Sequence, residues 1–201
     1  MAVVLIVTGA LTVFGLGVLG FARTPKATST PPSSSAPSTT HPASHPLQQR
    51  GLTRSEAVRL TIPAIGVDGG LQSLGLNADR KTMQLPEPAR AGWYKQGATP
   101  GETGPTIVVG YITSQHGPGV FSHLNALKVG SRVELRRADG KVVIYGVDQV
   151  ATYTAKNFPT TKVYAPTQAP TLRLITCGGL LRRGAPMGNV VVYGHQVAVR
   201  S

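Results

Sequence analysis

Turn-forming glycine, proline, asparagine and aspartate residues punctuate the chain about every 8–12 residues from position 58 onward. Between these turns lie short runs rich in residues of high β propensity, at 59–62, 70–74, 106–111, 132–136, 141–150, 171–176 and 190–193. This rhythm predicts an all-β barrel or sandwich, with short helical turns only near 121–127 and 155–158. Ala138-Asp139-Gly140, between two of the runs, predicts a hairpin turn.

Cys177 stands where the run 171–176 ends, and it is the only cysteine in the chain, so no intramolecular disulfide can form. Gly178 and Gly179 follow at once; they break the strand and leave backbone N–H groups free to face a developing oxyanion. Most free cysteines are small buried hydrophobic residues. An unpaired thiol in an exported protein usually marks intermolecular pairing or reactivity, and we therefore interpret Cys177 as a reactive nucleophile.

Residues 2–21 contain no charged residue, and their number matches the ~20 apolar residues that span the hydrocarbon core of a bilayer. A cleaved signal peptide is the alternative, although its apolar region is normally shorter and its start basic. We therefore expect a transmembrane anchor at residues 1–22. Residues 23–57 are expected to be a linker, because the Ser/Thr/Pro-rich stretch 28–40 cannot bury enough apolar surface to fold.

The orientation of the anchor follows less directly from the sequence. Arg23 and Lys26 come just after the apolar segment, and the positive-inside rule would leave the rest of the chain in the cytoplasm. The anchor and stalk that precede the folded part instead indicate a protein that works just outside a membrane. We therefore expect the folded domain to be extracytoplasmic.

The formal net charge of +12 favours contact with polyanions, such as nucleic acid, anionic lipid or an acidic cell wall. The sequence has no helix-turn-helix pattern, zinc spacing or aromatic RNA-binding motif, so nucleic acid is not an expected partner. No cluster of His, Cys, Asp and Glu has the spacing of a metal site, and we expect neither a metal nor a cofactor.

Several segments together resemble a class F sortase, one of the membrane-anchored cysteine transpeptidases of Gram-positive bacteria, here of actinobacterial type. The similar segments are Leu-Thr-Ile-Pro-Ala-Ile-Gly-Val-Asp at 60–68, Ala-Gly-Trp-Tyr at 91–94, Thr-Ile-Val-Val-Gly at 106–110, Gly-Pro-Gly-Val-Phe at 117–121, Phe-Pro-Thr at 158–160, Leu-Arg-Leu-Ile-Thr-Cys-Gly-Gly at 172–179 and Asn-Val-Val-Val-Tyr at 189–193. The resemblance implies an eight-stranded sortase-type β-barrel over residues 58–201. It also implies a single-pass anchor that holds this domain outside the cell membrane.

Enzymes of this family cleave a Leu-Pro-X-Thr-Gly sorting signal of a secreted protein at the Thr–Gly bond. The resemblance implies that the thiolate forms an acyl-enzyme, which an amine of the cell wall or of a pilin resolves. The family uses a cysteine, a histidine and an arginine, and Cys177 matches the first. Tyr111 stands at the position of the histidine, and Thr113 at that of the usual aspartate. Without the imidazole, Cys177 is expected to keep a thiol pKa near ~8.5.

Other residues are candidates for the two missing roles. His116, in the loop after Tyr111, is a better substitute for the histidine than His123 or His195. His195 is expected about 20 Å from the Cys-proximal end of the last strand, at ~3.3 Å per residue. Met187 occupies roughly the place expected for the arginine, and the nearest arginines are Arg182 and Arg183. Arg183 is the first candidate because it is nearer the final strand.

Two functions stay open at this point. The intact Thr176-Cys177-Gly178 sequence favours a sortase-type transpeptidase. Tyr111 favours a sortase-fold pseudoenzyme that binds sorting signals or cell-wall components without turnover. Under either function we expect the runs 106–111 and 171–176 to lie side by side, so that Tyr111 lies near Cys177.

Overall fold

The computed structural model describes residues 51–115, 117–177 and 188–201. The expected anchor, most of the expected linker, His116, Arg182 and Arg183 lie outside these residues. Among the helices of the described part, none has the length and apolar character needed to cross a membrane. The anchor and its orientation therefore stay predictions.

Short strands dominate the described residues, and helices are few and short. In chain order the elements are β1 (Ala57–Ile62), η1 (Pro63–Ile65), β2 (Val67–Gly70), β3 (Gln72–Leu74), β4 (Gly92–Tyr94), β5 (Gly104–Tyr111), β6 (Thr113–Ser114), β7 (Gly117–Pro118), η2 (Leu124–Ala126), β8 (Arg132–Arg137), β9 (Val142–Tyr153), α1 (Thr160–Tyr164), β10 (Pro170–Cys177) and β11 (Asn189–Arg200). The all-β prediction is confirmed.

The predicted helical turn at 155–158 is misplaced, because these residues form a bend and turn and α1 begins only at Thr160. The hairpin turn at 138–140 is confirmed. Gly140 adopts a φ of 86°, and Arg137 donates its N–H to the carbonyl oxygen of Lys141 at 2.8 Å. A positive φ is costly for other residues, which is why glycine occupies this turn.

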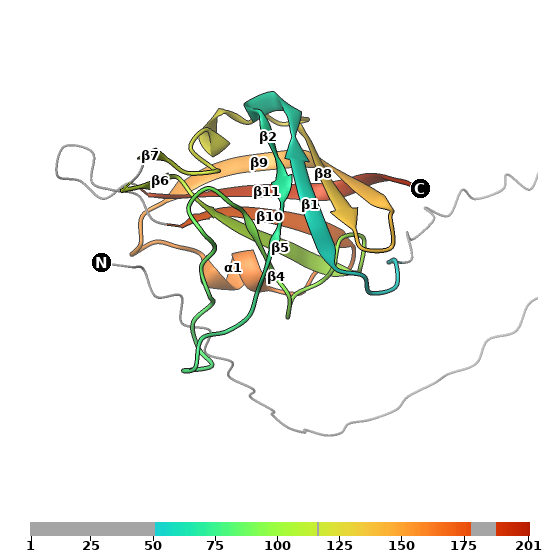
Figure 1. Cartoon of the computed structure of the whole chain (residues 1–201), viewed down its shortest axis with the longest axis horizontal. Coiled ribbons are helices and arrows are strands. Elements are labelled where there is room, and N and C mark those ends of the chain that lie inside the picture. The colour runs from blue at the N-terminus through green and yellow to red at the C-terminus, as the bar shows by residue number, and fades with distance from the viewer. Residues whose placement is uncertain (1–50, 116, 178–187) are drawn as a thin grey trace, which may run out of the picture. The chain divides into compact units, whose positions relative to one another are not determined.

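Nine strands form one sheet in the order β2-β1-β8-β9-β11-β10-β5-β4-β3 (Figure 1). The two strands at the ends of this order, β2 and β3, are separated in the chain by Leu71 alone. Since β2 pairs with β1 and β3 pairs with β4, the sheet closes on itself as a barrel. Counting β2 and β3 as one bent strand gives the eight strands that the resemblance implied.

Apolar side chains cover both faces of the strands β5 and β10. One set fills the barrel interior, where it includes Val108, Leu172 and Leu174. A second cluster lies on the opposite face and contains Leu74, Ile107, Val109, Val163, Ile175, Val191 and Tyr193. Successive side chains of a strand point to opposite faces, so strands buried along almost their whole length require cover on both sides. Val163 of α1 is fully buried and supplies part of this outer cover.

The packed domain includes residues that precede β1. Leu52 donates its backbone N–H to the carbonyl oxygen of Gly101 at 2.7 Å, and its side chain packs against the interior cluster. The fully buried guanidinium of Arg137 donates through Nη2 to the carbonyl oxygen of Thr53 at 2.7 Å. The same group pairs with Asp139 at 2.8 Å. The segment before β1 therefore stabilises the barrel.

We expect a chain that begins at Gln48 to have a higher free energy of unfolding than one that begins at Val58. The shorter chain lacks the Thr53 carbonyl, and a buried N–H of Arg137 left without an acceptor costs about 1–3 kcal/mol. Urea unfolding followed by the fluorescence of Trp93, which is the only tryptophan and is buried, measures the difference. Equal unfolding free energies would contradict a stabilising role for the segment.

Candidate active site

Cys177 is the last residue of β10, and it lies directly beside the last residue of β5. The two strands run parallel, and their register pairs Cys177 with Tyr111. The expectation that these two residues lie near one another is therefore confirmed. The preceding Thr176 is buried, and its Oγ1 accepts a hydrogen bond from the backbone N–H of Val190 at 2.8 Å. This bond ties the start of β11 to the strand end that carries the thiol.

Aromatic residues gather around the half-buried Cys177 on the outer face of the barrel. The thiol packs against the outer cluster together with Tyr94 and Tyr164. Tyr164 comes from α1, which lies against the sheet in Figure 1. Its hydroxyl oxygen is buried and has no hydrogen-bond partner among the described residues. Burial first, and then the negative charges of ionised Cys177 and Tyr94, raise the pKa of this hydroxyl. It therefore stays protonated and remains a donor.

Burial raises the pKa of the Cys177 thiol to about 12, although backbone hydrogen bonds at Cys177 and Gly110 act in the opposite direction. Among the described residues, no lysine, arginine or histidine adds a positive charge that lowers it. The sequence-based expectation of a pKa near ~8.5 missed this desolvation. With the described surroundings alone, the thiol is protonated at neutral pH.

Tyr111 cannot take over the role of an imidazole at this position. Burial, and secondarily the charge of an ionised Cys177, raise the pKa of its hydroxyl above the usual value. A protonated phenol donates a hydrogen bond to an oxyanion or a thiolate, but it is not a proton acceptor near neutrality. The described part of the site therefore offers a nucleophile and hydrogen-bond donors without a general base.

A small pocket of about 220 Å³ opens on the same face as the thiol. Its walls are Leu76, Met83, Tyr94, Gln96, Gly97, Ala98, Pro105, Ile107 and Tyr164. Ile107 lies four residues before Tyr111 on β5, so both side chains point to one face. Four residues of strand span about 13 Å. An extended peptide that passes Cys177 along this face can therefore reach the pocket.

Of the two described histidines, His195 lies far from the thiol. His195 pairs with Thr171, at the opposite end of β10 from Cys177, and its Nδ1 lies 2.6 Å from Oδ1 of Asp148. Six residues of strand separate Thr171 from Cys177, or about 20 Å, which agrees with the distance expected for this histidine. His123 is exposed and contacts the Ser122 hydroxyl at 3.2 Å.

Arg173 shares the outer face of β10 with Cys177 but is directed elsewhere. Its Nη1 donates to the carbonyl oxygen of Leu172 at 2.8 Å, and its guanidinium lies 4.8 Å from the ring centroid of Tyr193. It lies four residues before the thiol, about 13 Å along the strand. Arg173 therefore does not serve an oxyanion at Cys177. The predicted candidates Arg182, Arg183 and His116 lie outside the described residues.

The sequence reasoning missed Tyr164 and the role of Tyr94 as its neighbour. Tyr94 belongs to a segment already noted for its resemblance to sortases, but nothing local pairs it with α1 or with the thiol. Residues 160–164 contain three β-branched residues, Thr160, Thr161 and Val163, which carry little helix propensity. No sequence signal therefore located the helix that positions Tyr164.

A family model described as the sortase domain matches residues 60–197 of the chain. Among curated proteins, no sequence matches it significantly. Solved structures that match include a sortase D5 transpeptidase of Clostridium perfringens, at 20% identity over 71% of this chain and 79% of that one, with a TM-score of 0.52. Sortase A of Listeria monocytogenes matches at 18% identity over 73% of this chain and 90% of that one, with a TM-score of 0.54.

A lid mutant of sortase A from Corynebacterium diphtheriae matches at 19% identity over 73% of both chains, with a TM-score of 0.53. At these identities the solved structures establish a common fold. The family model covers well over half of the sequence, including β5, β10 and Cys177. The chain therefore belongs to the sortase family.

Proposed function

We propose that the chain is an extracytoplasmic, membrane-anchored transpeptidase of the class F sortase kind from a Gram-positive bacterium. It cleaves a Leu-Pro-X-Thr-Gly-like sorting signal of a secreted protein through an acyl-enzyme on Cys177. The acceptor is an amine of the cell wall or of a pilin, and residues 2–21 contact membrane lipid. The observation that carries the proposal is the position of Cys177 at the end of β10, on the barrel face that also carries an apolar pocket.

In this reaction Sγ of Cys177 attacks the carbonyl carbon of the Thr–Gly bond. The carbon–nitrogen bond breaks, a thioester forms, and the thiol proton passes to the departing glycine amine. The acceptor amine then attacks the thioester carbon, gives its proton back to sulfur and leaves as the new amide. Tyr111, as a permanent donor, is suited to stabilise the oxyanion of each tetrahedral intermediate.

The pocket near Ile107 and Tyr164 suits the apolar start of such a signal. The leucine lies three residues before the threonine, about 10 Å in extended form, and the pocket begins within about 13 Å of the thiol along β5. The pocket walls are mostly apolar, which favours an aliphatic side chain over a charged one. The Tyr164 hydroxyl, without a partner among the described residues, can donate to a backbone carbonyl of the peptide.

The test of the proposal is intact-mass analysis of the full chain after incubation with a Leu-Pro-X-Thr-Gly peptide. We expect a mass increase equal to the acyl part of the peptide, located on Cys177, and we expect it to form faster as the pH rises because the thiolate fraction grows. Cys177→Ala is the control and must give no adduct. Absence of any adduct at high pH would contradict the transpeptidase function.

Binding of sorting signals or cell-wall components without turnover is the second candidate function. It is favoured by the occupation of the histidine position by Tyr111 and by the thiol pKa of about 12. A chain with this function binds the peptide reversibly with no adduct at any pH. Intact-mass analysis for an acyl adduct on Cys177 therefore distinguishes the two functions.

Tyr111→His is expected to speed acyl-enzyme formation at neutral pH on the order of 10²–10⁴-fold. An imidazolium beside Cys177 lowers the thiol pKa and also supplies a proton to the departing amine. Stopped reactions with the same peptide, quantified by mass, give the rate. Tyr111→Phe is the matched control, since it keeps the ring but adds no titrating group, and it should not be faster than the parent chain. An unchanged rate in Tyr111→His would show that another group already transfers the proton.

Tyr164→Phe is expected to change stability and peptide affinity in opposite directions. Removing a buried hydroxyl that has no partner raises the free energy of unfolding by about 1 kcal/mol. Losing a donor to the peptide backbone weakens peptide binding about twofold to tenfold. The control is Tyr94→Phe, because the Tyr94 hydroxyl already donates to Gln96 at 2.7 Å and its removal should not stabilise the chain. Unchanged affinity in Tyr164→Phe would exclude a direct contact with the peptide.

A further inference from the structure

One edge of β2 has backbone groups without partners in the described part of the chain. Leu71 donates its N–H to the carbonyl oxygen of Val58, and antiparallel hydrogen bonds involve every second residue. The ladder with β1 therefore uses the backbone of Val67, Gly69 and Leu71. The N–H and C=O groups of Asp68 and Gly70 point away from β1.

Two residues after Gly70, the same edge is paired again, at Gln72. The N–H of Gln72 points to the same edge as those of Asp68 and Gly70, and it donates to the carbonyl oxygen of Ala91 at 3.0 Å. Before Ala91 the chain diverges from β2, because Pro88 instead accepts a hydrogen bond from the backbone N–H of Val120. The pairing of the sheet thus stops at Gln72 and leaves the edge at Asp68 and Gly70 open.

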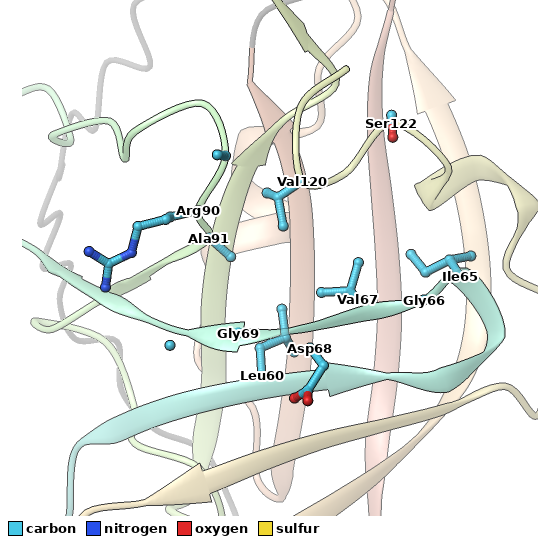
Figure 2. Close-up of a pocket in the computed structure, with 12 residues that line it drawn as sticks. Leu60, Ile65, Gly66, Val67, Asp68, Gly69, Arg90, Ala91, Val120 and Ser122 are labelled. Atoms are coloured by element: carbon cyan, nitrogen blue, oxygen red, sulfur yellow. The ribbon is translucent and has the colours of Figure 1, made fainter. Parts of the chain in front are cut away.

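A pocket of about 370 Å³ occupies this gap. It is lined by residues 66–70 of the β2 edge and by Leu60, Ile65, Ala89, Arg90, Ala91, Val120 and Ser122. Figure 2 shows Arg90, Ala91 and Val120 on the side of β2 that faces away from β1. The volume lies within the roughly 300–1,000 Å³ of known ligand sites. None of these residues belongs to the cluster around Cys177 or to the smaller pocket near it.

The chemistry of the pocket favours an extended peptide with a negative charge, because the Asp68 carboxylate in its lining is already paired with Arg59 at 2.7 Å. Its floor includes the apolar side chains of Leu60, Val67 and Val120, which accept apolar side chains spaced two residues apart. Arg90 is exposed and makes no ion pair among the described residues. Its Nη2 lies 3.7 Å from the position of a Cβ built on Gly70, so a free cation stands at one end of the open edge.

We propose that this pocket binds an extended segment of a partner protein, which adds to the β2 edge as a further strand and places an acidic side chain against Arg90. The backbone of the segment pairs with Asp68 and Gly70, and every second side chain enters the apolar floor. Backbone pairing supplies affinity in such strand addition, while the pockets for alternate side chains and the charge supply specificity. The four residues of β2 span about 13 Å, enough for a segment of four residues.

The probe is an acetylated and amidated hexapeptide of alternating valine and threonine with a glutamate at one end, made in both orientations and labelled with fluorescein. Anisotropy measures its binding to the full chain, and amide hydrogen exchange by NMR reports on β2. We expect slower exchange at the amides of Asp68 and Gly70 in the complex. The amides of Val67 and Gly69, already paired with β1, should be unchanged.

Three matched comparisons make this test specific. A peptide N-methylated at alternate residues on the pairing edge should lose binding, because it cannot complete the ladder. Arg90→Glu should weaken binding of the glutamate peptide on the order of fivefold. It should strengthen binding of the same peptide carrying lysine in place of glutamate. Arg136→Glu, at an exposed arginine of β8 outside the pocket, makes the same charge change and should leave binding unaltered.

Three results would overturn the proposal. They are absence of binding by either orientation of the glutamate peptide, equal binding of the N-methylated peptide, and binding without protection of Asp68 and Gly70. Acyl-enzyme formation at Cys177 is measured separately, so failure here leaves the proposed transpeptidase function standing.

Discussion

The parallel pairing of β5 with β10 is the interaction on which the rest of the site depends. It places Tyr111 and Cys177 side by side at the shared carboxyl end of the two strands. Both strands are buried along almost their whole length, which requires apolar cover on both faces of the sheet. The barrel interior covers one face. On the other, α1 and the chain around Leu76 and Met83 supply the cover and leave the small pocket between them.

This cover has a chemical consequence for the nucleophile. The same packing that holds β10 in register removes water from Cys177 and stabilises the neutral thiol. A cysteine transpeptidase normally offsets this desolvation with a nearby cation, and here the adjacent position in β5 is occupied by Tyr111. The described residues thus keep the sortase fold and the thiol, with a small apolar pocket on the same barrel face. They lack a cation that would lower the pKa of the thiol and so favour the thiolate.

The sequence predicted β1, β5, β8, β9 and β10 well because each is a run of β-branched and apolar residues bounded by turn residues, but it missed β4 and most of β2. It failed where tertiary packing overrides local preference. The β11 strand continues to Arg200, although Gly194 looked like its end, because a register shift at Tyr193/Gly194 lets the pairing with β9 resume. The helix α1 contains β-branched residues and forms because Val163 is buried against the sheet.

For the candidate site, too, the residues that depend on local sequence could be predicted, and those that depend on tertiary packing could not. Cys177 and Tyr111 could be named because both end predicted strands. Cys177 matches a known motif, and Tyr111 stands where that motif has its histidine. The contribution of Tyr164 could not, since it depends on where α1 packs. The free edge of β2 was equally hidden, because it arises from the divergence of the chain before Ala91 and has no signature in the residues themselves.

The central claim is that Cys177 is a sortase nucleophile that the described part of its site does not activate. The most direct measurement is the rate of alkylation of this single thiol by iodoacetamide in the folded full chain, as a function of pH. Since burial raises its pKa to about 12, the rate should rise about tenfold per pH unit through the alkaline range without a plateau. In urea the unfolded chain should instead reach a plateau above ~8.5. A plateau below neutral pH in the folded chain would show a stabilised thiolate and contradict the account.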